Sequence, residues 1–588
     1  MASFHKMLLC LLERIFLTTK FLSVNHKNVR FYFVTFAMFI LYCVMIWRVL
    51  DLSYFGREKY LKSLKNIRKL TNVIHARRGN ILDRNLEVLA LDEKKITIGV
   101  DPYAANMDND IKKICSMAEM LNIDAKKVVE KFDKKQRSIG GKLQKIRWEP
   151  ICEINIESLY SAINSLKIRG VYGIRDSKRL YPFGSKTSHI TGFINHENMP
   201  ICGIEKFMDA YLRGRDGQIE SERDGRSGEL VKYRNKEIPK RDGYDVVLTI
   251  DKNIQCIVFD EIQDIIKKFN PQSVSIIVSE AQTGEILALA NYPDYDPNDY
   301  GKFPIENMKN LAVSNVYEPG SVFKIVAMSF GIEYGLVDED TIFDCSKSTA
   351  INRGKTIKLP NDHSQFGKLT FVDAVRKSSN RAAAQIAMMI GEEQFYDCVR
   401  NFGFGEKAGY GFDAESKGIL WPTNKWDALT ITRLPMGHAI GVVPLQTHCA
   451  MSVIANDGIL TKPLIIKKIL NGREAIFENF PTVKRQVLSQ ETAVRMRKVM
   501  HNPENGKLLC GVSFGGKSGT GQKIINGKYS HEHHTSSYSG FFPVDTPKIV
   551  VTVIIDDAHR DYGIAWGSTV SLPSFKNISE KIAQYLDL

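Results

Sequence analysis

The sequence predicts an α+β multidomain protein with an N-terminal transmembrane helix, and three observations support this fold class. The chain has 588 residues, of which 44% are hydrophobic, so about two to four domains with buried cores are expected. An uncharged apolar run lies near the start, at residues 31–47. Beyond residue 240, strand patterns at both ends enclose a long stretch of helical patterns, which predicts a sheet with an all-helical insertion.

The apolar run Phe31–Trp47 is 17 residues long, at the short end of the roughly 17 to 25 residues that span a bilayer. Aromatic residues at both ends suit the two membrane interfaces. No small-residue cleavage site follows. We therefore expect an uncleaved signal anchor at residues 31–50 behind a cytoplasmic tail at residues 1–30. A buried core helix is the alternative.

Residues 51–240 form a charged region that is rich in turn signals. The alternating run Lys95–Val100 predicts a strand, and apolar residues three and four apart predict helical segments around Asp110–Phe132. This composition indicates an irregular α+β domain with extended arms. A second domain is expected at residues 241–588, because a turn at Asp242–Tyr244 leads into a new strand pattern.

The second domain has the clearest patterns. Its expected strands are residues 245–250, 273–278, 285–290, 513–520, 538–542 and 549–555. The run Ile549–Ile555 is continuously apolar or β-branched, which is typical of a central strand buried on both faces. Helical patterns cover 321–337, 371–401 and 574–588.

The overall composition favours some partners over others. The net charge of +14 and the isoelectric point of about 9.1 suit nucleic acids, anionic membranes or cell-wall polymers. No basic tract interleaved with aromatic residues stands out, so no nucleic-acid partner is expected. The ten cysteines form no Cys-x-x-Cys pair, which argues against zinc and redox motifs. Scattered buried thiols are favoured over disulfides.

Three short motifs follow one another in the second domain: Ser321-Val322-Phe323-Lys324, Ser378-Ser379-Asn380 and Lys517-Ser518-Gly519-Thr520. Each alone occurs easily by chance. The ordered set matches the Ser-x-x-Lys, Ser-x-Asn and Lys-Thr-Gly motifs of penicillin-recognising serine enzymes. An acyl-transfer enzyme is therefore the leading hypothesis.

The first motif has the chemistry of a nucleophile beside its base. Glu318-Pro319-Gly320 precedes it, so Ser321 should lie near a helix N-terminus, with Lys324 one turn further on the same face. A serine hydroxyl needs an adjacent base, and a desolvated lysine near another cation is neutral enough to serve. The alternative is an ordinary helix start with an exposed lysine.

The second motif lies between two helical stretches. A hinge loop there would direct Ser378 at a leaving group and Asn380 at a substrate amide. The alternative is a helix N-cap, for which serine and asparagine are common choices.

The third motif is expected on an edge strand. There Gly519 would permit close approach of a ligand, while Lys517 and the hydroxyls of Ser518 and Thr520 would bind a carboxylate. The backbone N–H groups of Ser321 and Thr520 would form an oxyanion hole, with about 3 to 4 kcal/mol per donor. A glycine-bearing β-bulge is the alternative.

From Ile74 onward the chain resembles a class B penicillin-binding protein. The signatures that carry this resemblance are Arg78–Arg84; Arg179–Gly184 with His189 and Gly192; Gly203–Glu205 with Leu212, Gly214 and Gly217; Leu248–Asp251; and Thr283–Ala288. The resemblance implies a non-catalytic, dimerisation-type pedestal at residues 51–240. It also implies a transpeptidase domain at 241–588, with an antiparallel sheet flanked by helices and an all-helical subdomain.

The resemblance further implies a D,D-transpeptidase that cross-links peptidoglycan stem peptides ending in D-Ala-D-Ala. Ser321 would be the acylated nucleophile, Lys324 its base and Ser378 the proton shuttle to the leaving D-alanine. Asn380 would hold the stem peptide. Lys517, Ser518 and Thr520 would bind the terminal carboxylate, and β-lactams would leave a slowly hydrolysed ester. No cofactor or metal is expected.

Within the class, Glu318–Gly320 and Lys377–Asn380 look more like the cell-division branch, the FtsI type. That branch implies a single-pass inner-membrane protein, mostly periplasmic, acting at the septum. Its implied partners are a SEDS-family glycosyltransferase of the FtsW type and other divisome membrane proteins. An elongation-type transpeptidase, a β-lactam hydrolase or sensor, and a non-catalytic divisome scaffold are the alternatives.

Several positions depart from the family pattern. Leu86 and Ala439 stand where glycine is usual, Val443 and Ser518 where threonine is usual, and Gly521 where alanine is usual. These changes affect the expected substrate selectivity and drug affinity.

The segment His531–His534 suggests a metal site, because His531 and His533 would share one face of a strand. An exposed, solvated loop in the hairpin after the third motif is favoured, so no metal is expected there.

Overall fold

The computed structural model describes residues 29–55, 57–139, 142–223, 229–525, 527–559 and 565–588. The predicted cytoplasmic tail lies almost wholly outside these residues. The chain divides into two compact units, Met1–Ile74 with Asp216–Lys240, and His75–Arg215 with Arg241–Leu588. Most of the expected pedestal thus belongs to the same unit as the expected transpeptidase domain. The predicted domain limits at residues 50 and 240 stay a prediction.

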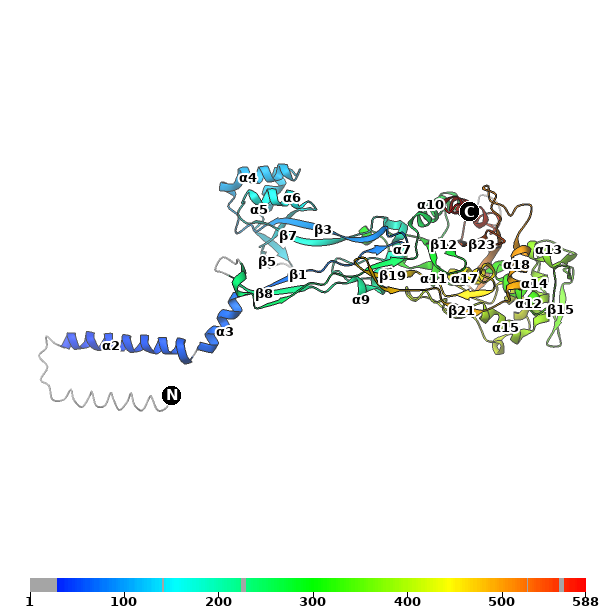
Figure 1. Cartoon of the computed structure of the whole chain (residues 1–588), viewed down its shortest axis with the longest axis horizontal. Coiled ribbons are helices and arrows are strands. Elements are labelled where there is room, and N and C mark those ends of the chain that lie inside the picture. Colours follow the sequence, from blue (N-terminus) through cyan, green and yellow to red (C-terminus); the bar gives the residue numbers. More distant parts are fainter. Residues whose placement is uncertain (1–28, 56, 140–141, 224–228, 526, 560–564) are drawn as a thin grey trace, which may run out of the picture. The chain divides into compact units, whose positions relative to one another are not determined.

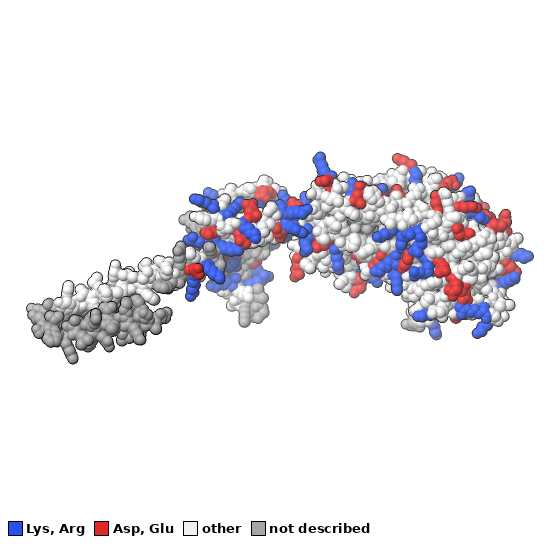
Figure 2. Space-filling model, turned by 60° about the horizontal axis from the view of Figure 1, so that its bottom comes forward, with Lys and Arg blue, Asp and Glu red and all other residues white. Residues whose placement is uncertain are grey.

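The first unit contains the predicted apolar helix, α2 (Val29–Leu50). The helical run Arg30–Tyr54 is long and apolar enough to cross a membrane, and its side chains are not buried in the protein. The alternative of a buried core helix is therefore wrong. Between Arg30 and Arg48 the helix α2 carries no charged side chain, and Figure 2 shows mainly uncharged residues there, whereas acidic and basic side chains are mixed over the visible face of the second unit.

After α2 come α3 (Arg57–Arg68) and a small antiparallel sheet. In this sheet β8 (Gly217–Arg223) pairs with β1 (Lys69–Ile74) and β10 (Lys236–Ile238). These strands are the extended arms expected from the sequence.

The second unit begins with a seven-stranded sheet. Its strands are β2 (Ile81–Leu82), β3 (Val88–Val100), β6 (Glu149–Ile154), β7 (Val171–Leu180), β11 (Asp245–Leu248), β19 (Ile466–Asn471) and β20 (Glu474–Glu478). The helices α4 (Met107–Met120), α5 (Ala125–Asp133) and α6 (Glu157–Ser165) pack on β3, β6 and β7 through a separate core. The helical segments predicted around 110–132 are these helices α4 and α5, and the positive φ of Asn122 (54°) lies between them.

The three pedestal signatures meet in one buried ion network. Arg78 Nε lies 2.6 Å from Glu205 Oε2, and Arg179 Nε lies 2.7 Å from Glu205 Oε1. Each arginine has a second carboxylate partner, Asp209 for Arg78 and Asp92 for Arg179. Residues more than 120 positions apart are therefore joined by charge pairs that almost no solvent reaches.

A second, five-stranded sheet is antiparallel, in the order β13-β12-β24-β23-β22. The strands are β12 (Ser273–Glu280), β13 (Ile286–Tyr292), β22 (Gly515–Ile525), β23 (Lys528–Phe542) and β24 (Ile549–Asp556). As predicted, β24 is the central strand and is buried along nearly its whole length, and β22 is an edge strand. Both results follow from the apolar pattern of β24 and from the glycine-rich, polar β22.

Helices cover both faces of this sheet. One core joins α10 (Lys252–Phe269) and α19 (Ser571–Tyr585) to side chains such as Ile276, and a second core joins α17 (Pro444–Ala455) to Ile277. Adjacent strand residues thus face different cores, as the alternation of side chains along a strand requires. The predicted fold class is confirmed.

Part of the insertion between β13 and β22 forms a lobe in which α12 to α15 and α18 gather (Figure 1). Its main helices are α12 (Ile325–Glu333), α13 (Phe371–Arg376), α14 (Asn380–Ile390), α15 (Glu392–Asn401) and α18 (Gln490–Met500). The lobe is not all helical, since it also carries short strand pairs. These are β14 (Ile342–Asp344) with β17 (Lys368–Thr370), β15 (Thr349–Asn352) with β16 (Lys355–Lys358), and β18 (Ile459–Thr461) with β21 (Val483–Gln486).

All nine cysteines in the described part of the chain are free thiols. Only Cys345, Cys398 and Cys449 are buried, so the expectation of buried thiols holds for three of them.

Candidate active site

The first motif begins in a 3-10 turn, Gly320–Lys324, that leads into α12. Gly320 has a φ of 59°, and a Cβ there would lie 2.7 Å from the Thr520 carbonyl oxygen. A Cβ on Gly437 would lie 2.2 Å from the Gly320 carbonyl oxygen. The turn is therefore held between β22 and the loop at Gly437, and only glycine fits at the two contact points. In this turn Lys324 Nζ lies 3.0 Å from Ser321 Oγ.

Ser378 lies between α13 and α14 in the left-handed region, with a φ of 56°. Lys324 Nζ donates to its carbonyl oxygen at 2.5 Å and lies 3.1 Å from its hydroxyl. Lys517 Nζ donates to the same hydroxyl at 2.8 Å. Such a backbone conformation persists only where the surroundings enforce it, and here two lysines hold both polar ends of the serine. The structure thus joins Ser321, Lys324, Ser378 and Lys517 in one chain of contacts.

The rest of the second motif has two roles. Ser379 is the N-cap of α14 and accepts from the backbone N–H of Ala382 at 3.1 Å. The N-cap interpretation is therefore correct for Ser379, while Ser378 faces the lysines. Asn380 lines the cavity, and its Nδ2 donates to the Asn361 carbonyl oxygen at 2.6 Å.

Asp362 supports this motif, and no sequence pattern pointed to it. Its carboxylate accepts from the Ser379 hydroxyl at 3.0 Å and from the backbone N–H groups of Asn380 and Arg381. An acidic group at a helix N-terminus is favoured by the unpaired N–H groups there. Asp362 therefore fixes the first turn of α14 and the Ser378 loop before it.

The third motif lies on β22, where Ser518, Gly519 and Thr520 line the cavity with Ser321. A Cβ on Gly519 would lie 2.5 Å from Ser537 Oγ and 2.8 Å from the Pro319 carbonyl oxygen. The close approach that requires glycine is thus made by the protein itself, not only by a ligand as expected. Thr520 Oγ1 accepts from the Gly567 N–H at 3.0 Å, which holds the rim of the cavity against β22.

The electrostatics differ between the two lysines. Burial, helped by the nearby charge of Lys517, holds the pKa of Lys324 well below its ordinary value, and Asp362 only partly opposes this. Burial lowers the pKa of Lys517 to about 8. The Lys324 amine is therefore the group whose lone pair is made available beside Ser321, while Lys517 still keeps its proton at neutral pH.

These residues surround a cavity of about 620 Å³. Sequence reasoning did not single out several of its other residues, which are His363, His438, Gln522, Trp566 and Ser568. They belong to none of the three motifs and reach the cavity through the fold.

The segment His531–His534 lies in strand β23 and not in a loop, which corrects that expectation. It belongs to the hairpin after the third motif, as expected, but β23 runs through it and His534 pairs with Gln522 of β22. His533 Nδ1 pairs with Asp557 at 2.7 Å, and the buried His534 lines the cavity. In the described residues no three His, Cys, Asp or Glu side chains are grouped so as to hold a metal ion.

Glu318, directly before the first motif, joins this turn to the Gly437 loop. Its carboxylate accepts from the Ala439 N–H at 3.1 Å and pairs with His438 Nδ1 at 2.9 Å. Ala439 has a φ of 60°, and Leu86, the other residue that replaces an expected glycine, has a φ of 68°. Both departures therefore place a side chain where the backbone conformation favours glycine.

Comparisons with known proteins identify the family of this chain. The family model described as "Penicillin binding protein transpeptidase domain" matches residues 274–580, and the one described as "Penicillin-binding Protein dimerisation domain" matches residues 73–248. The chain belongs to the class B penicillin-binding proteins. It is accordingly a peptidoglycan D,D-transpeptidase, as the resemblance implied, with a pedestal and a transpeptidase domain.

Known relatives match over most of the chain. Stage V sporulation protein D of Bacillus subtilis is 30% identical over 554 residues, covering 92% of this chain and 84% of the relative. Peptidoglycan D,D-transpeptidase FtsI of Buchnera aphidicola is 27% identical and covers 98% of both chains. The crystal structure of penicillin-binding protein 3 of Mycobacterium tuberculosis matches with a TM-score of 0.65 and 26% identity, over 88% of this chain and 98% of that one. The same relative has been solved with aztreonam, a β-lactam.

Proposed function

We propose that the protein cross-links peptidoglycan stem peptides through an ester on Ser321. The observation that carries this proposal is the 3.0 Å contact between Ser321 Oγ and the desolvated Lys324 amine. Lys324 takes the hydroxyl proton as Oγ attacks the carbonyl carbon of the penultimate D-alanine. The oxyanion that forms accepts from the backbone N–H groups of Ser321 and Thr520.

The proton then moves to the leaving group through Ser378. The Ser378 hydroxyl lies 3.1 Å from Lys324 Nζ and 2.8 Å from Lys517 Nζ, so it links the base to the carboxylate-binding side of the site. As the C–N bond breaks, the terminal D-alanine leaves as an amine with that proton, and Ser321 keeps the acyl group. The amine of a neighbouring stem peptide attacks the ester by the reverse proton path and frees Ser321.

Residues of the edge strand β22 and of α14 bind the donor, the stem peptide that acylates Ser321. The protonated Lys517, with the hydroxyls of Ser518 and Thr520, binds the terminal carboxylate, and Gly519 keeps the strand close to the nucleophile. Asn380 holds the stem-peptide backbone. A β-lactam is captured by the same steps, but its leaving group stays attached and the ester hydrolyses slowly.

We further propose that α2 is a single-pass anchor in the inner membrane and that the bulk of the chain lies in the periplasm. The division branch is favoured by Glu318–Gly320 and Lys377–Asn380 and by the similarity to an FtsI. Its partners would be an FtsW-type glycosyltransferase and divisome proteins. The similarity to a sporulation protein keeps another cellular role, including an elongation-type one, as the second candidate.

Labelled penicillin tests the site. We expect a stable covalent label on Ser321 in the wild type and none in Ser321→Ala. Rapid turnover of the label would indicate a hydrolase, and absence of label would indicate a scaffold. With its glycosyltransferase partner, the purified wild type should make cross-linked muropeptides that Ser321→Ala does not make. A fluorescent fusion that accumulates along the lateral wall and not at the septum would contradict the division assignment.

A further inference from the structure

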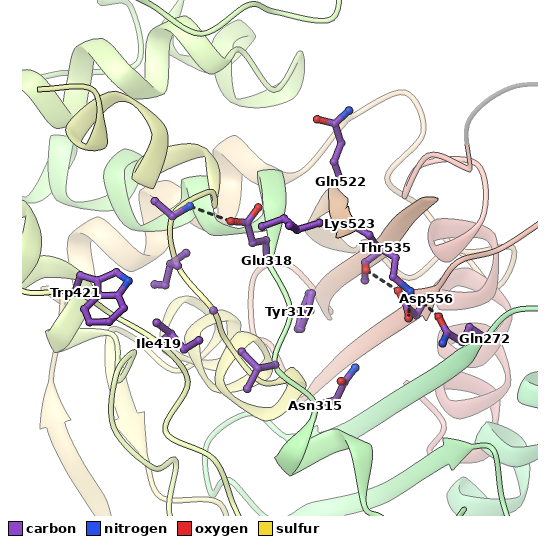
Figure 3. A pocket seen from close by; sticks show the side chains of 15 residues that line it. Gln272, Asn315, Tyr317, Glu318, Ile419, Trp421, Gln522, Lys523, Thr535 and Asp556 are labelled. Carbon is purple, nitrogen blue, oxygen red and sulfur yellow. Dashed lines mark hydrogen bonds and ion pairs between the residues drawn. The ribbon is translucent and has the colours of Figure 1, made fainter. Parts of the chain in front are cut away.

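A second cavity lies beside the active site and is as large, about 620 Å³ (Figure 3). One wall is the segment Asn315–Glu318, which leads directly into the nucleophile turn. The sheet side is formed by residues of β22, β23 and β24. Gln522, on edge strand β22, lines both cavities. A ligand that extends along β22 from Ser321 therefore reaches the second cavity.

The two sides of this cavity differ in chemistry. On one side Trp421 and Ile419 are about half exposed, at 51% and 49%. On the other side Lys523 Nζ lies 2.8 Å from Asp556 Oδ2 and 2.6 Å from Gln272 Oε1. Figure 3 shows the indole of Trp421 on the opposite side of the cavity from this polar group. An apolar aromatic face thus lies across from amide, carboxylate and ammonium groups.

Neighbouring residues contact both the backbone and the indole ring of Trp421. Its carbonyl oxygen accepts from Trp426 Nε1 at 2.8 Å, and Lys425 Nζ lies 4.4 Å from the centre of its ring. Among the described residues outside α2, the exposed tryptophans are Trp421 and Trp566, and each lines one of the two cavities. A large aromatic side chain held exposed in a cavity is typical of a binding site.

We propose that this second cavity binds an amino-sugar unit of the glycan strand that carries the donor stem peptide. The apolar C–H face of a pyranose ring packs on an indole, while its hydroxyl and acetamido groups require hydrogen-bonding partners, which Gln272, Asn315 and Asp556 supply. The volume lies within the range of pockets for ligands of this size. Because Asp556 already pairs with Lys523, the wall favours a neutral polar ligand over a phosphate. This inference rests on the proposed transpeptidase function.

Binding of stem-free glycan tests the proposal. The full-length protein in detergent is titrated with oligosaccharides of alternating N-acetylglucosamine and N-acetylmuramic acid from which the peptides have been removed and whose lactyl carboxyl groups are capped as amides, so that the ligand is neutral, and calorimetry gives the Kd. We expect Trp421→Ala to weaken binding at least tenfold and Trp421→Phe, which keeps an aromatic face, to weaken it much less. Phe480→Ala is the matched control, since Phe480 is 67% exposed and lines neither cavity.

Kinetics separate this inference from the proposed function. Trp421→Ala should raise KM at least fivefold for a donor attached to glycan and leave kcat unchanged. It should leave both KM for a sugar-free peptide donor and penicillin labelling of Ser321 unchanged. Absence of glycan binding by the wild type would overturn the inference. An equal rise in KM for the sugar-free donor would also overturn it, because the cavity would then hold peptide. Loss of labelling in the wild type would instead overturn the proposed site chemistry.

Discussion

The pedestal and the active site both bury cations, and they treat them in opposite ways. In the pedestal, Arg78 and Arg179 are surrounded by Glu205, Asp92 and Asp209. Burial lowers the pKa of Arg179, but Glu205 and Asp92 outweigh it and the net shift is upward. In the active site, the hydrogen-bond partners of Lys324 are serine oxygens.

The desolvation of a buried cation therefore has two different consequences, which depend on whether a carboxylate lies beside it. A buried cation with opposing carboxylates stays charged, and it ties distant segments together. A buried amine without such a partner loses its proton more easily and becomes a base. The predictions below test this contrast, starting with the largest expected effect.

Replacing the base should remove chemistry and spare the fold. Lys324→Met is expected to slow acylation of Ser321 by about 10² to 10⁴-fold, the usual contribution of a positioned general base. Because the wild-type amine is desolvated, the thermal midpoint should not fall. Stopped-flow measurement of penicillin acylation and a thermal melt of the same sample provide the test. If the thermal midpoint of Lys324→Met also fell by many degrees, Lys324 would be needed for stability, and the loss of rate could not be assigned to its role as a base.

Breaking the buried ion network of the pedestal should lower folding stability and leave the chemistry of the active site intact. Arg179→Met leaves Asp92 without its ion-pair partner and leaves the buried Glu205 with Arg78 alone, and breaking a buried pair in this way costs about 3 to 5 kcal/mol of folding free energy. The control is Arg175→Met on the same strand, where the pair with Glu157 is exposed and no change is expected. Urea unfolding measures both variants, and penicillin labelling of the folded fraction should persist. Equal stability of the two variants would contradict the role of the network.

The pH dependence of the acylation rate should reflect the protonation of both Lys324 and Lys517. On the acidic side, acylation rises with pH as Lys324 loses its proton, at a pH well below the ordinary lysine value. On the alkaline side, Lys517 loses its proton above about pH 8, carboxylate binding weakens, and the rate falls about tenfold per pH unit. Second-order acylation rates from pH 5 to 10 measure this profile. If Lys517→Met kept the alkaline limb, Lys517 would not be its source.

The smallest expected effect concerns the two residues that replace glycine. Ala439→Gly and Leu86→Gly remove a left-handed backbone cost of about 1 to 2 kcal/mol, which the greater freedom of glycine in the unfolded chain partly offsets. Each variant should be as stable as the wild type or up to about 1 kcal/mol more stable. In contrast, Ala162→Gly within α6 should cost about 1 kcal/mol. Unfolding curves give the free energy of unfolding of the three variants. A lower value for Ala439→Gly or Leu86→Gly than for the wild type would show that these positions carry no left-handed backbone cost.

Much of the architecture could be predicted because it depends on local pattern. The apolar run of β24 determines its central position, and the glycines and polar residues of β22 suit an edge. Helix limits were less predictable, since Ser378 and Asn122 end helices through positive φ values that their residue types do not require. The strand pairs in the helical lobe were missed because strands of three or four residues carry little periodic signal.

By itself, the sequence determined the family, the order of the three motifs and the apolar helix, because residue type and spacing suffice for these. Tertiary structure alone decided that Asp362 holds the Ser378 loop, that His534 and Trp566 border the site, and that a second cavity meets the first at Gln522. It also decided which buried cations are paired and which are not. The physical reason is that burial and charge pairing depend on neighbours in space, which come from segments far apart in the chain.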